Sequence, residues 1–506
     1  MSGSTLIFRH LEKTSTAQIP VASTEVFRRE VLAAVAEDCR LASFHGAPQA
    51  GGGIRLTAIL ADDRAGELRA ISTEPGDAYP ALTPDCPQAG GFEREIAEQW
   101  GVKPLGHPWL KPLRFHRSYR PGHDAWGRAG EASPTPSVME FFRVEGEGIH
   151  EVAVGPVHAG IIEPGHFRFQ CHGEQVLHLE ISLGYQHRGV ERALVGGPHP
   201  RTIHQMETLA GDTTIGHALA YCQALEALSG CRVPARAQAL RAVALELERL
   251  ANHTGDLGAL AGDVGFLPTS SYCGRLRGDF LNMTALLCGS RFGRGFVRPG
   301  GTAFDVDAAR VDDLRQRIDA TFRDVGGAAN LLWETASVMA RFENTGVVSG
   351  ARAAELGLVG PAARACGREI DVRRDFPSGI YRFAQLPVSA LDSGDVFARA
   401  YVRWMEIQRS VAFIRDQIAA LPGGAMRAPC GPLAPGATVV SLQEGWRGEI
   451  AHVAATDEAG RFVRYKVVDP SFHNWLGLAL ALRGQEISDF PLCNKSFNLS
   501  YCGHDL

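Results

Sequence analysis

The cysteines of this chain constrain how it can be held together. There are eleven of them in 506 residues, and no two form a Cys-x-x-Cys pair. Their odd number and scattered spacing fit reduced thiols better than a disulfide framework, and a zinc site of the usual kind needs such pairs. With 45% apolar and 21% charged residues, the chain is expected to fold as an ordinary globular protein around a hydrophobic core.

Length and charge narrow the class further. A chain of 506 residues suggests two to four domains, and a net charge of −5 gives no indication of nucleic-acid binding. No apolar run approaches the roughly 18 residues that would span a bilayer, and residues 1–12 lack the apolar core of a signal peptide. We therefore expect a cytoplasmic location, with any membrane association provided by partner subunits.

Hydrophobic periodicity predicts an α+β chain. Residues 1–120 are expected to form a small α/β domain, with helices over 24–39 and 92–100 and a strand over 53–61. A linker rich in Gly and Pro covers 121–140. Residues 141–506 are expected to form a mainly helical domain with a peripheral β-sheet. The long helices are predicted at 235–253, 311–342 and 396–418, and the strands at 149–154, 166–171, 176–181, 438–441 and 448–455.

The string over residues 92–114 contains Glu93-Arg-Glu95 and, further on, Gly106-His-Pro108. By itself it reads as an amphipathic surface helix that ends at Gly101 as its C-cap. The whole string resembles the signature of the accessory 30-kDa subunit of respiratory complex I. That resemblance implies an assembly role, without a cofactor, for the first 120 residues.

A second cluster of Gly, Pro and His includes Gly155-Pro-Val-His158, the run 163–168 and His187-Arg-Gly189. The plain interpretation is a hairpin with solvated histidines. Order and spacing resemble the large subunit of group 4 nickel-iron hydrogenases and its relative, the 49-kDa subunit of complex I. The resemblance implies that His187 and Arg188 face the terminal iron-sulfur cluster of a neighbouring subunit, where an arginine raises the reduction potential. It also implies that His158 belongs to a quinone-like cavity.

On the predicted helix 235–253, Glu246, Arg249 and His253 fall near one face. A salt-bridge ladder explains them as well as a functional role does. In the resembled families an Asn-His at this point lies close to the cluster, so His253 would couple its protonation to the cluster's charge. The run 288–305 is close to a signature that both relatives share, which extends the resemblance over about 150–506.

The cysteines that bind the metals in a hydrogenase are missing from the matching positions of this sequence. Those enzymes carry Cys-Gly-x-Cys-x-x-x-His, and a match on His217 puts Ala210 and Thr213 at the cysteine positions. The C-terminal pair falls at Tyr501 and His504, one place away from Cys502. Alanine cannot bind a metal and threonine is a poor nickel ligand. We therefore expect no metal bound by this chain and no nickel-iron centre.

The usual quinone constellation is also incomplete. Its histidine and tyrosine positions fall at Ile162 and Gly211, so quinone remains an expected ligand only with substituted residues. The polar C-terminus could line a remodelled cavity. As a hypothesis, a proton relay is expected there from Asp212, His217 and His504, with Thr213 and Asp505 beside them.

The resemblance implies a subunit of a membrane-attached, energy-converting oxidoreductase, of NADH-quinone oxidoreductase or formate hydrogenlyase type. It would couple electron transfer at a neighbouring cluster to proton or ion translocation. Expected partners are a small iron-sulfur subunit, a ferredoxin-like subunit and antiporter-like membrane subunits. The alternatives are a hydrogenase of unusual ligation, a quinone-reducing subunit with substituted residues, and a non-redox scaffold, and whether the chain is itself an enzyme stays open.

Overall fold

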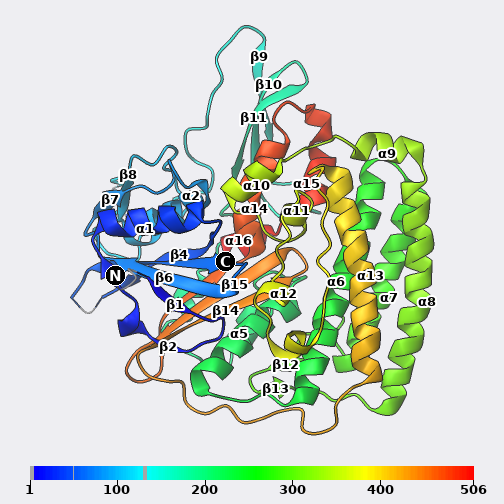
Figure 1. Cartoon of the computed structure of the whole chain (residues 1–506). Helices are drawn as coiled ribbons and strands as arrows, with labels where there is room; N and C mark the ends of the chain where they lie inside the picture. The colour runs from blue at the N-terminus through cyan, green and yellow to red at the C-terminus, as the bar shows by residue number, and fades with distance from the viewer. Residues whose placement is uncertain (1–4, 50, 129–133) are drawn as a thin grey trace.

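Two mainly antiparallel sheets and a stack of long helices make up most of the molecule (Figure 1). The computed structural model describes residues 5–49, 51–128 and 134–506. Residues 1–4 of the expected first domain and 129–133 of the expected linker 121–140 lie outside the described residues. Helices and strands form separate layers instead of alternating βαβ units, so the expected α+β class is confirmed.

The N-terminal sheet has the strand order β1-β6-β5-β4, and β3 pairs in parallel with β6. Helix α1 begins after Ser23, whose hydroxyl accepts a hydrogen bond from the Val26 N–H, and it buries Phe27 and Val31 at helical spacing. Helix α2 ends where the sequence predicted, because Gly101 takes the left-handed conformation with φ +67°. The elements are β1 (Leu6–Phe8), β3 (Val21–Ala22), α1 (Thr24–Ala36), β4 (Arg40–Pro48), β5 (Ile54–Asp62), β6 (Glu67–Thr73), β7 (Ala78–Pro80), α2 (Gly90–Trp100) and β8 (Lys103–Leu105).

The sheet near the C-terminus is buried at the centre of the molecule. Its order is β16-β15-β14-β2, built from β2 (Thr14–Ser15), β14 (Ala437–Gly445), β15 (Gly448–Thr456) and β16 (Phe462–Val468). Helix α5 (Thr214–Ser229) contacts β14 and β15, while β4 of the N-terminal sheet contacts β15 and β16. Val440, Leu442 and Val453 pack in the same hydrophobic cluster as the N-terminal strands. The two sheets therefore share one core.

A third sheet projects from the molecule beside the C-terminal helices (Figure 1). Its order is β11-β10-β9, from β9 (Ile149–Val154), β10 (His166–His172) and β11 (Gln175–Ser182). The connection between β9 and β10 carries three exposed apolar side chains, Val157, Ile161 and Ile162. Exposed apolar groups gathered in one loop are typical of an interaction surface.

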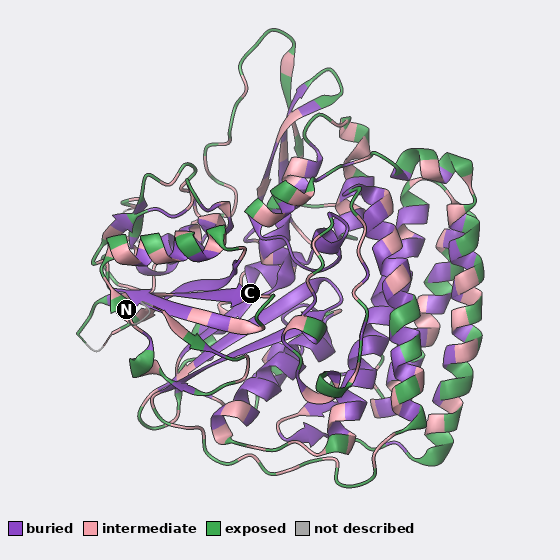
Figure 2. Cartoon of the chain, in the orientation of Figure 1, coloured by how far each residue is buried: buried purple, intermediate pink, exposed green. Residues whose placement is uncertain are grey.

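Long helices form the other half of the molecule. Figure 2 shows α6 buried along most of its length and α8 outermost and exposed on its outer face, and α6 contacts both α13 and α7. The prediction of one helix over 311–342 is wrong, because Thr335 takes an extended conformation (φ −89°, ψ 103°) and separates α8 from α9. The helix predicted over 235–253 continues to Asp263. The bounds are α6 (Ala235–Asp263), α7 (Leu267–Cys288), α8 (Ala308–Trp333), α9 (Ala336–Phe342) and α13 (Val396–Ala419).

Short elements connect these layers and complete the C-terminus. They are α3 (Val190–Ala193), α4 (Thr202–Met206), β12 (Val297–Arg298), β13 (Gly301–Thr302), α10 (Gly350–Leu356), α11 (Gly360–Arg364), α12 (Val372–Asp375), α14 (Pro470–Ala481), α15 (Phe490–Phe497) and α16 (Tyr501–Asp505), with the 3₁₀ turns η1 (Thr16–Gln18), η2 (Pro87–Ala89), η3 (Gly379–Phe383) and η4 (Ile487–Asp489).

Candidate functional site

Arg188 joins the two motif segments that the sequence singled out. Its exposed guanidinium donates to the carbonyl oxygens of Thr208 (2.8 Å), Leu209 (2.9 Å) and Cys502 (2.9 Å). Its backbone N–H also donates to the Leu506 carbonyl at 2.7 Å. The segment before α5 and the C-terminal helix α16 therefore form one wall, with Arg188 at its surface.

His187 lies behind Arg188 and faces the protein. Its ring stacks on His116 with centroids 4.7 Å apart, and its Nδ1 lies 2.8 Å from the Asp505 carbonyl. Burial and the nearby Arg114 charge lower the pKa of His187 to about 4. At neutral pH this imidazole is therefore uncharged and adds no positive charge beside Arg188.

Asp212 and Thr213 stand next to the wall and are held by Arg447, at the turn between β14 and β15. The guanidinium of Arg447 donates to both carboxylate oxygens of Asp212, at 2.6 and 2.8 Å, and to the Thr213 hydroxyl at 3.3 Å. Burial alone would raise the pKa of Asp212, but the charge and hydrogen bonds of Arg447 outweigh it and the pKa is lowered. Asp212 is thus an ionised carboxylate, with a side chain still 32% exposed.

His217 lies deeper, in a chain of buried polar groups. Its Nε2 is 3.0 Å from Asp469 Oδ2 and its Nδ1 is 3.2 Å from His452 Nε2. The opposite nitrogen of His452 lies 2.8 Å from the Tyr465 hydroxyl. Burial, followed by the neighbouring His217, holds the pKa of His452 well below its usual range. This chain links α5 to the central sheet and to the start of α14.

His504 is the third member of the hypothesised relay. Its Nδ1 lies 3.0 Å from Asp505 Oδ1, and Asp505 also accepts from the Gly184 and Gln186 N–H groups at 2.8 and 2.9 Å. Burial lowers the pKa of His504 more than Asp505 raises it. Within the described residues, no hydrogen bond connects Asp212, His217 and His504 to one another.

A close contact between α16 and the Asp469 side chain nevertheless brings two parts of the hypothesised relay together. A Cβ on Gly503 would lie 2.6 Å from Asp469 Cγ, so α16 approaches the partner of His217 as only glycine allows. His504 follows Gly503 directly in the chain. The elements that carry His217 and His504 are therefore adjacent, while their imidazoles bond to separate carboxylates.

His253 lies away from the surface, in α6. It is fully buried, its Nε2 lies 2.9 Å from Glu406 Oε2, and its Nδ1 has no hydrogen-bond partner within the described residues. Arg249 bonds Glu246 at 3.1 Å and lies 3.4 Å from Glu406, so the salt-bridge ladder predicted for this helix exists. Contact of His253 with a neighbouring cluster stays a prediction.

His158, predicted for a quinone-like cavity, is half-buried in the β9–β10 connection. Its Nε2 lies 2.9 Å from the Gly165 carbonyl oxygen, and its ring packs against Phe167 with centroids 5.7 Å apart. Glu163 of the same loop accepts from the N–H groups of Tyr501 (3.4 Å) and Cys502 (3.2 Å). The loop is therefore fastened to the same C-terminal segment that Arg188 holds.

The four positions matched to hydrogenase cysteines do not fit a nickel-iron centre. Ala210 offers a methyl group, and Thr213 already bonds Asp212 at 3.1 Å. The ring of Tyr501 packs edge-on against Trp475, with centroids 4.9 Å apart. Among the described residues, no three His, Cys, Asp or Glu side chains are grouped so as to hold a metal ion. The donor set lacks the thiolates that this pair of metals requires.

Cys502 does not replace the missing ligands. Burial, together with the neighbouring Glu163 carboxylate, raises the pKa of its thiol to about 12. A thiol with this pKa stays protonated at neutral pH and is a weak metal ligand.

Sequence reasoning missed Arg447, Asp469 and His452, which hold Asp212 and His217. They lie 235 to 252 residues along the chain from their partners. No local pattern marks them. Only the pairing of β14, β15 and β16 brings them to α5, and β16 itself was not predicted.

Comparison with known proteins identifies the family to which this chain is related. The model of the family described as respiratory-chain NADH dehydrogenase, 49 Kd subunit, matches residues 263–434. The chain is 31% identical over 350 residues to the carbon monoxide-induced hydrogenase of Rhodospirillum rubrum, an alignment that covers 69% of this chain and 97% of that protein. It is 25% identical over 467 residues to the C/D subunit of NADH-quinone oxidoreductase from Bdellovibrio bacteriovorus, covering 84% and 82%.

The fold is similar to a chain in the structure of the membrane-bound sulfane sulfur reductase, an archaeal respiratory membrane complex. The TM-score is 0.67 at 23% sequence identity, and the match covers 71% of this chain and 99% of that chain. No helix in the described ranges combines the length and apolar character needed to cross a bilayer. On the matched lengths and identities, this chain belongs to the family of the 49-kDa subunit of respiratory NADH dehydrogenase and the large subunits of group 4 hydrogenases, in the fused C/D form.

Proposed function

We propose that this chain is a subunit of a membrane-attached, energy-converting oxidoreductase complex of NADH-quinone oxidoreductase or formate hydrogenlyase type. In that complex it couples electron arrival at an iron-sulfur cluster of a neighbouring subunit to proton or ion translocation. The similarities to a hydrogenase, to a fused C/D chain of NADH-quinone oxidoreductase and to a chain of a respiratory membrane complex support this proposal.

The surface around Arg188 is the proposed contact with the small iron-sulfur subunit. Arg188 is exposed there, and the loop that bonds the same C-terminal segment carries Val157 (76% exposed) and Ile161 (86% exposed). Apolar side chains together with the positive charge of Arg188 suit a contact with a protein surface that carries an electron-accepting cluster. A ferredoxin-like subunit and antiporter-like membrane subunits complete the proposed complex, and through them the chain lies on the inner face of the cell membrane.

The observation that carries the proposal is that the two matched segments form one wall but supply no thiolate ligands for nickel and iron. Arg188 ties both motif segments together, while Ala210, Thr213, Tyr501 and His504 occupy the positions matched to cysteines. We therefore propose a role in coupling and not in hydrogen activation. Asp212, His217 and His504 are proposed to handle protons there, with Asp212 as the solvent-facing end and the His217–Asp469 pair inside.

Substitution of Arg188 tests the proposal within the purified complex. Arg188→Met removes the positive charge, so the midpoint potential of the terminal cluster should fall by roughly 50 mV or more, the effect of a unit charge several ångströms away at an effective dielectric constant of about 20. Redox titration followed by electron paramagnetic resonance measures it. Arg188→Lys retains the charge and should largely preserve the potential.

Arg201→Met is the control, because Arg201 is exposed just before α4 and its side chain forms no hydrogen bond or ion pair within the described residues. It should leave the potential unchanged. A cluster potential that stays the same in Arg188→Met would point instead to a scaffold without a redox contact. Protection of the His158 loop by a quinone analogue would favour the alternative, quinone reduction with substituted residues.

A further inference from the structure

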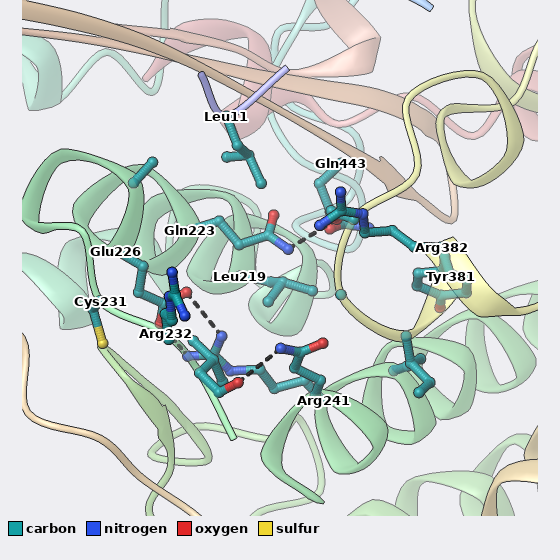
Figure 3. A pocket seen from close by; sticks show the side chains of 17 residues that line it. Leu11, Leu219, Gln223, Glu226, Cys231, Arg232, Arg241, Tyr381, Arg382 and Gln443 are labelled. Carbon is teal, nitrogen blue, oxygen red and sulfur yellow. Dashed lines mark hydrogen bonds and ion pairs between the residues drawn. The ribbon is translucent and has the colours of Figure 1, made fainter. Parts of the chain in front are cut away.

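A cavity of about 520 Å³ lies apart from the wall held by Arg188, between α5, α6, η3 and the strand β14. Figure 3 shows Gln223 and Leu219 of α5 on one side and Arg382 and Tyr381 of η3 on the other. None of the residues proposed above for electron or proton transfer lines it. Its chemistry is therefore separate from the proposed coupling function.

The cavity has an excess of positive charge. Arg241 is neutralised by Glu226, which accepts from its guanidinium at 2.6 and 3.1 Å. Arg232 and Arg382 also line the cavity, and within the described residues neither side chain has a hydrogen bond or an ion pair. Two unpaired guanidinium groups beside one neutral pair favour an anionic occupant.

Two buried amides on the wall have unused polar atoms. Gln223 is 8% exposed and Gln443 is 2% exposed, and the Oε1 atom of each has no partner within the described residues. The Gln223 Nε2 group donates to the Ser378 hydroxyl at 2.9 Å. Both amides line the cavity together with Arg382. Leaving a buried amide unpaired costs about 1–3 kcal/mol, so native proteins normally give such groups a partner.

Apart from Gln238 and Tyr381, the rest of the lining is mainly apolar. Leu11, Leu219 and Ile380 supply aliphatic surface beside the polar groups. A concave site with aliphatic walls and a few convergent polar groups is the usual form of a small-molecule site. The polar groups determine which part of a ligand is recognised, and here they are a planar guanidinium fork and two amides.

We propose that this cavity binds a small organic carboxylate. The carboxylate accepts from Arg382, whose fork matches its two oxygens, and the amides of Gln223 and Gln443 turn to offer N–H groups. The apolar body of the ligand packs on Leu11, Leu219 and Ile380, and Arg232 adds charge at the mouth. This site does not depend on the proposed redox role of the chain.

Calorimetric titration of the full chain with benzoate, hexanoate and succinate tests the proposal. At least one acid should bind, and Arg382→Gln should weaken that binding by about tenfold or more, the usual loss when a charge-assisted hydrogen bond is removed. Where benzoate binds, benzamide should bind at least about tenfold more weakly, because it has the same shape without the charge.

Arg323→Gln is the matched control, since Arg323 is exposed on α8, lies outside the cavity and has no hydrogen bond or ion pair within the described residues. It should bind as the unaltered chain does, and urea unfolding of each variant checks that the fold is intact. The absence of binding by all three acids at about 20 mM, a concentration that detects even millimolar affinity, overturns the proposal. Equal binding to Arg382→Gln and the unaltered chain also overturns it.

Discussion

Glu246 shows how single residues stabilise the buried charges of α6. Its carboxylate is fully buried and accepts from Ser410 (2.6 Å), Tyr381 (2.7 Å) and two arginines, Arg249 (3.1 Å) and Arg373 (3.1 Å). Burial would raise its pKa, but the arginines and hydroxyls hold the pKa at about 2. A carboxylate with so many donors favours the folded state only while it is ionised.

The pH dependence of stability follows from that pKa. The stabilisation from Glu246 should be complete above its unfolded pKa of 4.5 and should be lost as the pH falls towards 2, a change of about 3 kcal/mol in the free energy of unfolding. Glu246→Gln cannot ionise. The stability difference between the unaltered chain and this variant should therefore be largest above pH 5 and shrink below about pH 4.5.

Urea unfolding at a series of pH values measures this difference. Glu355→Gln is the control, because Glu355 is an exposed carboxylate on α10 whose one ion pair among the described residues is with Arg352, and its effect should stay within about 0.5 kcal/mol. A difference between the unaltered chain and Glu246→Gln that does not change with pH would show that the carboxylate is not ionised in the folded state.

At the scale of elements, α11 packs against the turn that carries Arg447. Gly360 has φ +66°, and a Cβ there would lie 2.2 Å from the Arg447 carbonyl oxygen and 2.4 Å from Gly448 Cα. Both of those neighbours are backbone, so the contact cannot relax by moving a side chain. The close packing of α11 therefore fixes the turn that presents the Arg447 guanidinium to Asp212.

Gly360→Ala should destabilise the chain by about 3 kcal/mol or more, because it combines a strained left-handed conformation with a backbone clash. Gly327→Ala is the matched comparison, since Gly327 lies in the exposed part of α8 with no atom within 4 Å of an added Cβ. That change should stabilise the helix by about 0.5–1 kcal/mol. Urea unfolding of both variants measures the two effects, and a neutral Gly360→Ala would contradict the tight packing of α11.

Helices and strands whose apolar residues recur at a regular spacing could be predicted from the sequence. Contacts between elements far apart in the chain could not. Helix α2 and its Gly101 cap, and the strands β9 to β11, follow from spacing and turn residues that lie within a few positions of one another. Thr335 ends α8 without a Gly or Pro signal, so that break was missed. The partners of Asp212 and His217 depend on strand pairing, which no local pattern records.

On the scale of the whole molecule, a buried ion pair joins the two sheets. The guanidinium of Arg40, in β4, donates to both carboxylate oxygens of Glu449, in β15, at 3.0 and 2.8 Å, and it also bonds Asp63 at 2.7 Å. The side chains of Arg40 and Glu449 are only 6% and 2% exposed. Removal of one charge leaves the other buried and uncompensated.

Arg40→Met should therefore lower the free energy of unfolding by about 3–5 kcal/mol. Arg55→Met removes the exposed pair with Glu74 in the same sheet and should cost less than about 1 kcal/mol. Urea unfolding followed by circular dichroism compares them. Equal losses in the two variants would mean that the sheets do not depend on the buried pair.

The core shared by the two sheets has a consequence for how the chain is made. The hydroxyl of Thr14 donates to the carbonyl of Thr438, 424 residues later, and a ribosome adding about 5–20 residues per second needs roughly 20–85 s to cover that distance. Throughout that interval the apolar face of the N-terminal strands that packs on β14 and β15 stays exposed to solvent and prone to aggregation. Nascent chains of this protein should therefore need chaperone protection until their last hundred residues leave the ribosome.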